Sequence, residues 1–145
     1  MISVIIPVFN AEKTIVKSLL SVKNQTYKGD FEIIIVNDGS TDSSQIIIEK
    51  FIQENTDQNI KVVDQENGGV SKARNAALKI CKGDFIALLD ADDEWLPTKI
   101  QSQMNAFENS DLEIDFLTTF CNNEKNIFPY KIRSDKNLVK ITLCK

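Results

Sequence analysis

Short runs of Ile and Val alternate with amphipathic segments along the first two thirds of the chain. Four of these apolar runs are bounded by polar turn residues: 2–9, 31–37, 60–63 and 85–89. Such runs are typical of strands that are buried on both faces of a parallel sheet. Between them lie three segments with apolar residues at helical spacing: 11–23, 43–54 and 70–82. This alternation predicts an α/β fold, with a doubly wound, mostly parallel sheet flanked by helices.

Each helix is expected to bury one stripe of residues. Asn10 is placed to cap the first helix, and Thr41 or Asp42 to cap the second. The expected apolar stripes of the first two helices are Ile15, Leu19 and Val22, and Ile46, Ile47, Ile48 and Phe51. The third helix carries Ala73, Ala76, Ala77, Leu78 and Ile80. The small residues of the third helix would allow a close approach to the sheet.

The pattern becomes less regular after the fourth apolar run. It predicts a helix over 95–108, a strand over 112–121 and shorter strands over 127–132 and 138–143. Residues 122–145 are more polar and more basic than the rest. We therefore expect one domain over residues 1–121, followed by an incomplete extension over 122–145.

Composition excludes several classes of protein. The 145 residues carry a net charge of −4, and a nucleic-acid binder would need a basic face. The absence of His removes His-based acid/base chemistry and His metal ligands. The three Cys residues form no CxxC pair, which favours a reducing compartment over a zinc or disulfide framework. No signal peptide or membrane-spanning run is seen, so we expect a cytoplasmic location, extending to the cytoplasmic face of the membrane. The sequence carries no signal for an oligomeric state.

Acidic residues follow the predicted strands. In a parallel sheet the loops after successive strands meet at one edge, where ligands bind. The carboxylates expected there are Asp38, Glu66, Asp90 and Asp92. Clustered oxygen ligands suit Mg²⁺ or Mn²⁺, which indicates a metal site for a phosphate-bearing ligand. The alternative is an acidic first turn of a helix, which Pro97 would also suit.

Phosphate and base recognition would need particular side chains. Neither GxGxxG nor GxxxxGK[ST] occurs, so phosphate would be held through the metal, with help from Lys72 or Arg74. These two could equally be solvated surface charges. Asp38 could accept the N–H of a uracil ring, which cytosine lacks, although guanine also presents an N–H. The alternative for Asp38 is an Asx turn beside Gly39.

Four motifs in order and at matching spacing resemble the family-2 glycosyltransferases. They are Val4–Asn10 (VIIPVFN), Ile35–Asp42 (IVNDGSTD), Asn67–Asn75 (NGGVSKARN) and Gly83–Asp93 (GDFIALLDADD). The resemblance covers residues 2 to 95, thins towards Cys121 and is absent beyond it. It implies a GT-A fold of the Rossmann-like type and a nucleotide-sugar donor, which in this family is usually a UDP-sugar and sometimes another nucleotide sugar. It also implies a glycan or lipid-linked acceptor, as in the synthesis of cell-surface polysaccharides.

The resemblance also implies roles for individual residues. Asp38 would read the base, and Asp92 would coordinate Mn²⁺ or Mg²⁺ on the diphosphate. Asp90 would lie near the ribose and the metal, since Asp90, Ala91 and Asp92 form the DxD element of the family. The remaining nucleotide-sugar contacts would come from Pro7, Val8, Phe9, Asn10, Glu12, Lys72, Arg74 and Asn75. Asp93 is a further neighbour of the DxD element.

The catalytic base is the part of the family pattern that we do not find. An inverting transfer needs a carboxylate to take the proton of the acceptor hydroxyl. Glu113 and Asp115 are candidates, but strand-edge charges are the favoured interpretation for both. We therefore expect the donor-binding half of a glycosyltransferase. The alternatives are a non-catalytic binding module and a nucleotidyltransferase, although the latter would normally carry a glycine-rich loop after its first strand.

Overall fold

The computed structural model describes residues 1–109, 116–119 and 141–144. It contains one sheet with the strand order β3-β2-β1-β4-β6-β5, in which every pair of neighbours is parallel. The strands are β1 (Ile2–Val8), β2 (Phe31–Asp38), β3 (Ile60–Gln65), β4 (Phe85–Leu88), β5 (Phe116–Thr119) and β6 (Ile141–Cys144). The helices are α1 (Ile15–Lys23), α2 (Ser44–Glu54), α3 (Val70–Leu78) and α4 (Lys99–Glu108).

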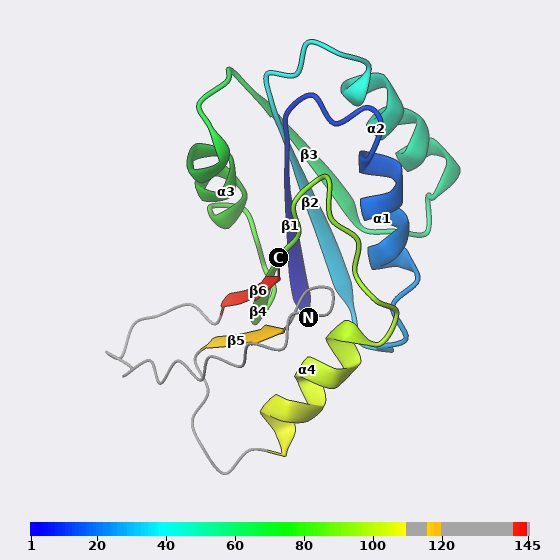
Figure 1. The fold of residues 1–145 in the computed structure, drawn as a ribbon, viewed down its shortest axis with the longest axis vertical. Coiled ribbons are helices and arrows are strands. Elements are labelled where there is room, and N and C mark those ends of the chain that lie inside the picture. The colour runs from blue at the N-terminus through cyan, green and yellow to red at the C-terminus, as the bar shows by residue number, and fades with distance from the viewer. Residues whose placement is uncertain (110–115, 120–140, 145) are drawn as a thin grey trace.

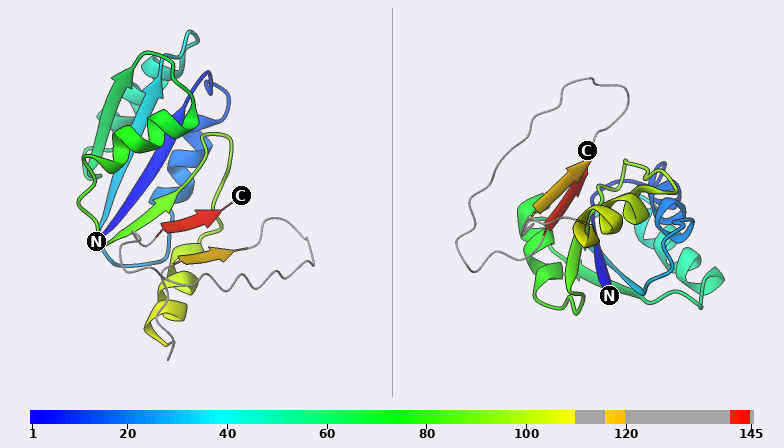
Figure 2. Two further views of the ribbon diagram at one scale, coloured as in Figure 1. Left: turned by 90° about the vertical axis from the view of Figure 1, so that its left-hand side faces the viewer. Right: turned by 90° about the horizontal axis from the view of Figure 1, so that it is seen from below.

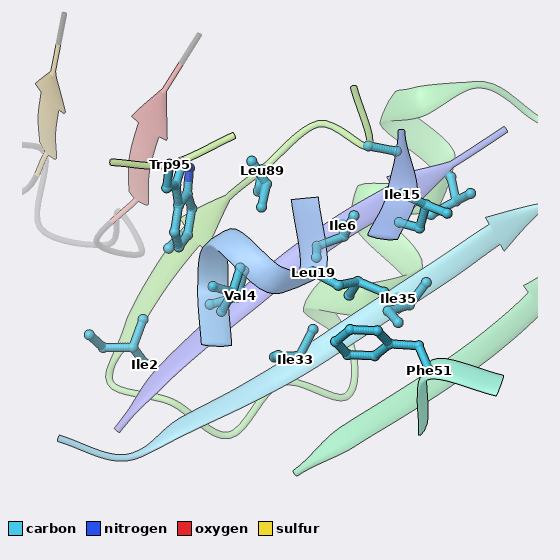
Figure 3. Close-up of a cluster of buried hydrophobic side chains, with 14 of the residues drawn as sticks. Ile2, Val4, Ile6, Ile15, Leu19, Ile33, Ile35, Phe51, Leu89 and Trp95 are labelled. Carbon is cyan, nitrogen blue, oxygen red and sulfur yellow. The ribbon is translucent and has the colours of Figure 1, made fainter. Parts of the chain in front are cut away.

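Helices cover both faces of the sheet, with α1 and α2 on one side and α3 on the other (Figure 1 and Figure 2). The alternation of side chains along β1 explains the two layers. Val4 and Ile6 belong to a core shared with α1, α2 and α4, part of which Figure 3 shows, whereas Ile5 packs with Ala73 and Ala77 of α3. The predicted doubly wound parallel α/β fold is confirmed.

The strand order creates a crevice at one edge of the sheet. From β1 the chain builds outward through β2 and β3, and it then returns through α3 to place β4 on the other side of β1. The helices that connect β1 to β2 and β2 to β3 lie on one face of the sheet, and α3, which connects β3 to β4, lies on the other. The two directions of winding therefore separate between the neighbouring strands β1 and β4. In open α/β sheets, ligands bind outside the carboxyl ends of the strands at such a switch point. The loops that follow β1 to β4 all end at this edge.

The helices are shorter than the sequence pattern predicted. Helix α1 begins at Ile15 rather than at residue 11, because Ala11 opens a turn whose carbonyl accepts the N–H groups of Thr14 and Ile15. Asn10 does not cap this helix, so that prediction was wrong. Helix α3 ends at Leu78 instead of residue 82, and α4 begins at Lys99 instead of residue 95.

The buried stripe of α2 also differs from the prediction. Ile48 is fully buried and Phe51 is 5% exposed, but Ile46 is 70% exposed. Ile46 lies two residues from Ile48, which is about 200° around a helix. The inclusion of Ile46 in the core was wrong. By contrast, Ala73 and Ala77 are fully buried against the sheet, as their small size predicted.

The last part of the chain is described only in two strands. The strand expected over 112–121 is observed as β5, and the one expected over 138–143 overlaps β6. The strand expected over 127–132 and the domain boundary at 121–122 lie outside the described residues. Among the helices that the structure describes, none has the length and apolarity needed to cross a bilayer.

Candidate functional site

A cleft of about 870 Å³ opens at the carboxyl edge of the sheet. The loops after β1, β2, β3 and β4 all contribute to it. Its walls are formed by Pro7, Val8, Phe9, Asn10, Ala11, Glu12, Lys13, Thr14, Asp38, Asp42, Asn67, Gly69, Val70, Ala73, Asp90, Ala91 and Asp92. The fold thus brings the ends of β2 and β4 together, and Asp38 and Asp92 share one cleft.

Asp38 is a buried carboxylate that other loops hold in place. Its side chain is 2% exposed. One oxygen accepts hydrogen bonds from Gln65 Nε2 at 2.6 Å and from the Gly68 N–H at 2.9 Å, and the other accepts from the Gly69 N–H at 2.7 Å. Gly69 has a φ of 84°, a conformation that favours glycine. The Gly68-Gly69 pair, which belongs to the motif Asn67–Asn75, therefore supplies two of the three donors.

These hydrogen bonds decide the charge of Asp38. Burial alone would raise its pKa, but the hydrogen bonds from Gln65, Gly68 and Gly69 outweigh the burial. The positive charge of Lys72 acts in the same direction. The pKa of Asp38 is therefore below its ordinary value, and the side chain stays ionised at neutral pH.

The loop after β1 is tied to the loop after β2. Asn10 adopts a φ of 50°, and its side-chain oxygen accepts the Thr41 N–H at 2.8 Å. Glu12 donates its N–H to Asp42 Oδ2 at 3.0 Å and accepts the Ser43 N–H at 3.0 Å. Asn10 and Glu12 thus connect two walls of the cleft. A non-glycine residue in this strained conformation persists only where surrounding contacts hold it.

The acidic residues after β4 form a tight turn. The Asp93 N–H donates to the Asp90 carbonyl at 3.0 Å. Arg74 Nη2 pairs with Asp90 Oδ1 at 2.5 Å, so Arg74 supports this turn from α3. Asp92 is exposed, and within the described part of the chain no hydrogen bond or ion pair occupies its carboxylate. Asp92 is therefore the carboxylate of the turn that is left for a ligand.

This donor set fits a cation that is shared with a ligand. No group of three or more potential ligands from His, Cys, Asp and Glu gathers among the described residues. Asp90 and Asp92 both line the cleft, however. Mg²⁺ is commonly bound by one or two carboxylates together with the phosphates of a substrate, rather than by a protein cage. The chemistry of the two carboxylates fits Mg²⁺ or Mn²⁺ on that basis.

Some predicted residues lie outside the lining of the cleft. Glu66 is exposed and does not join the other carboxylates, contrary to expectation. Its carbonyl accepts Lys72 Nζ at 3.4 Å. Lys72, Arg74 and Asn75 are also absent from the lining, and Asn75 is exposed. Direct contacts of these three with a nucleotide stay predictions.

Other lining residues were missed by the sequence reasoning. Lys13, Thr14, Asp42, Asn67 and Val70 line the cleft. Asp42, Asn67 and Val70 lie within the recognised motifs, and Lys13 and Thr14 follow Glu12, so these positions were the available signal. Phe9 and Val70 are 52% and 48% exposed, so the cleft has apolar surface as well as carboxylates.

Comparison with known proteins identifies the family. A family model described as Glycosyl transferase family 2 matches residues 3–141. The chain belongs to glycosyltransferase family 2. Its fold is accordingly of the GT-A type, and its relatives are transferases.

Two relatives and one solved structure illustrate the similarity. An uncharacterized glycosyltransferase of Nostoc sp. is 41% identical over 111 residues, covering 77% of this chain and 34% of that protein. The Escherichia coli UDP-Glc:alpha-D-GlcNAc-diphosphoundecaprenol beta-1,3-glucosyltransferase WfaP is 38% identical over 131 residues, covering 82% of this chain and 49% of its own. TarS of S. aureus, solved with UDP, gives a TM-score of 0.73 at 31% identity over 89% of this chain and 38% of TarS. The chain thus spans less than half the length of each of these proteins.

Proposed function

We propose that this chain binds the donor of an inverting, metal-dependent glycosyltransferase that transfers sugar from a UDP-sugar to a glycan or lipid-linked acceptor. The observation that carries the proposal is the single cleft shared by Asp38 and Asp92. TarS has been solved with UDP and with UDP-GlcNAc, and WfaP is named for a UDP-glucose donor and a diphosphoundecaprenol-linked acceptor. These relatives support the assignment of the donor and of the acceptor class.

Asp38 would read the base. A carboxylate offers about four lone-pair positions, and three of those on Asp38 accept hydrogen bonds within the protein. One position remains for the N–H of a uracil ring. Cytosine presents a hydrogen-bond acceptor at the same ring position. An ionised carboxylate is also only an acceptor, so the two could not form a hydrogen bond. The exposed ring of Phe9 offers a surface for stacking on the base.

Asp92 would hold the metal at the other end of the donor, with Asp90 beside it. When bound there, Mn²⁺ or Mg²⁺ would supply positive charge next to the diphosphate leaving group. Arg74 neutralises part of the charge of Asp90, and it keeps that carboxylate in the turn. Asp92 has no such partner in the described chain, which makes it the principal ligand in this proposal.

The transfer step would follow from this arrangement. The acceptor hydroxyl would attack the anomeric carbon on the face opposite the diphosphate. The bond between that carbon and the diphosphate oxygen would break, UDP would leave with the electron pair, and the hydroxyl proton would pass to a carboxylate. Glu113 and Asp115 lie outside the described residues, so no residue is assigned to that step. We propose that the reaction takes place at the cytoplasmic face of the membrane and that it serves the synthesis of cell-surface polysaccharides.

Calorimetry of UDP binding with and without Mn²⁺ tests the proposal. Asp92→Asn removes the charge but keeps the size of the side chain. Loss of a metal contact worth several kcal/mol should weaken binding in Mn²⁺ by about 100-fold or more. Asp57→Asn is the control, because Asp57 is exposed and is not part of the cleft lining.

Three results would contradict the proposal. UDP binding that is independent of metal and unchanged by Asp92→Asn would contradict the proposed metal site. A folded protein that binds no UDP would contradict the proposed donor site. UDP affinity without sugar transfer in the full-length protein would indicate a non-catalytic binding module.

A further inference from the structure

We propose that Ser18 of α1 is a positioning residue for the Asp90–Asp93 turn. The inference rests on the proposed function and extends it to a residue outside the cleft. Ser18 is fully buried and lies in the middle of α1. Its hydroxyl is 2.9 Å from the Ala91 carbonyl and 2.7 Å from the Asp93 carbonyl. The single hydroxyl proton is thus shared between the two carbonyls that flank Asp92.

The turn needs such support because the sheet no longer holds it. Strand β4 ends at Leu88, and the Leu89 N–H donates to the Ile5 carbonyl at 3.0 Å. From there to Lys99, where α4 begins, the chain has no regular structure. Among the described residues, no hydrogen bond or ion pair fixes the carboxylate of Asp92, so the backbone on either side decides where it lies. Ser18 holds that backbone on both sides.

A second set of contacts, from the residues just after α1, holds the far end of the segment. Gln25 lies two residues beyond Lys23, where α1 ends. It donates to the Leu96 carbonyl at 2.8 Å and accepts the Ile100 N–H at 2.9 Å. The Thr26 N–H donates to the Pro97 carbonyl at 2.8 Å. The region from Ser18 to Thr26 therefore holds the connection between β4 and α4 at both of its ends.

This arrangement links the two halves of the cleft. The residues just before α1, from Asn10 to Thr14, line the cleft directly. The same helix holds the turn that carries Asp92 through Ser18. One rigid element thus sets the distance between the loop after β1 and the acidic turn. A displacement of about 1 Å in a binding site can cost about 100-fold in function.

Ser18→Ala and Ser21→Ala form a matched pair for testing this role. Both remove one hydroxyl from α1, but among the described residues the hydroxyl of Ser21 bonds only within the helix, to the Ser18 carbonyl at 2.7 Å. The first readout is hydrogen exchange of the Asp93 N–H, measured by NMR without metal or nucleotide. We expect faster exchange by about tenfold or more in Ser18→Ala, and no change in Ser21→Ala.

The second readout is UDP affinity in the presence of Mn²⁺. We expect Ser18→Ala to weaken it by about tenfold, as loss of an outer contact to a metal ligand typically does. UDP affinity without metal should be the same in both variants. If Ser18→Ala does not fold, Ser18→Cys replaces it with the same two readouts, because a thiol fills the site but is a much weaker hydrogen-bond donor than a hydroxyl.

The outcomes separate this inference from the proposed function. Equal exchange at Asp93 in the two serine variants, with equal UDP affinity in Mn²⁺, would overturn the role of Ser18. A wild-type protein that binds UDP without any need for metal would contradict the proposed function instead. In that case, faster exchange in Ser18→Ala alone would still establish that Ser18 holds the turn.

Discussion

Two buried carboxylates lie near opposite ends of β2 and have different partners. Glu32 is fully buried at the start of the strand and pairs with Lys61 at 2.6 Å. It also accepts hydrogen bonds from the Ser3 hydroxyl and from the Lys82 N–H. Asp38, at the other end, accepts hydrogen bonds from neutral donors, namely the Gln65 amide and the Gly68 and Gly69 N–H groups. Glu32 is neutralised within the protein, whereas Asp38 keeps a charge that a ligand can use.

Glu32→Gln should lower the free energy of unfolding by about 3 kcal/mol at pH 7, because it leaves Lys61 unpaired and turns an amide towards backbone N–H groups. Glu54→Gln is the control. Glu54 pairs with Lys50 on the surface, where both side chains are more than half exposed, so its loss should cost less than about 0.5 kcal/mol. Urea unfolding of the three proteins measures both values. Equal costs would show that the buried network contributes nothing.

The difference in stability between the wild type and Glu32→Gln should also depend on pH, in a direction that follows from the pKa of Glu32. Burial raises the pKa of Glu32, but its hydrogen bonds and Lys61 outweigh this and lower the pKa from 4.5 to about 2. A lowered pKa stabilises the folded state above the ordinary value, and this stabilisation is lost as the pH falls towards the folded value. The stability gap between wild type and Glu32→Gln should therefore shrink from about pH 5 to about pH 2. A constant gap would contradict the lowered pKa.

At the scale of the element, narrow stripes of each helix contact the sheet. Helix α1 buries Ile15, Leu19 and Val22, as their spacing predicted. Helix α2 carries three consecutive Ile residues, of which only Ile48 is fully buried. Helical periodicity cannot show which of several adjacent apolar residues is buried, because each of them can belong to a different apolar face of the helix. The packing of α2 against the sheet decides which one is inside.

Ile48→Ala and Ile46→Ala compare the same substitution at a buried and an exposed position of α2. Ile48→Ala should cost about 2–5 kcal/mol through lost burial and a cavity. Ile46, which is 70% exposed, should change stability by less than about 0.5 kcal/mol. Chemical denaturation measures the difference. Similar costs would mean that α2 packs through a different face.

At the scale of the whole molecule, the cleft exists because four strands end at one edge. The order β3-β2-β1-β4 sets four loops side by side, although their residues are far apart in sequence. Asn10 then joins the first two of these loops, and Gly68 and Gly69 join the second to the third. The fourth is held by α1 and by Arg74. The site is therefore a property of the sheet and not of a single motif.

Thermal unfolding with nucleoside diphosphates tests this assembled cleft. UDP at about 100 times its dissociation constant, with Mn²⁺, should stabilise the protein by about 2.7 kcal/mol and raise Tm by about 5–10 °C. CDP is the matched control, since it differs in the ring position that Asp38 would read. Equal shifts for UDP and CDP would contradict base selection by Asp38. A larger shift with GDP would point to a guanine nucleotide instead.

Sequence reasoning reached the fold and much of the cleft for identifiable reasons. Strands buried on both faces produce unbroken apolar runs such as Ile33–Val36, and the turn residues after them mark where the loops begin. It failed at Glu66, because a position after a strand does not say whether a side chain faces the cleft. It also missed Gln65, whose contact with Asp38 crosses between neighbouring strands and leaves no local pattern.

The sequence by itself determined the order of strands and helices, the family motifs and the acidic composition of the loops, since these depend on residues close together in the chain. The tertiary structure alone decided which carboxylates share a cleft, that Asp38 is held ionised by the loop after β3, and that Ser18 lies behind the turn carrying Asp92. These contacts join residues about 30 to 75 positions apart. Only the packing of the sheet and its helices brings such residues within hydrogen-bonding distance.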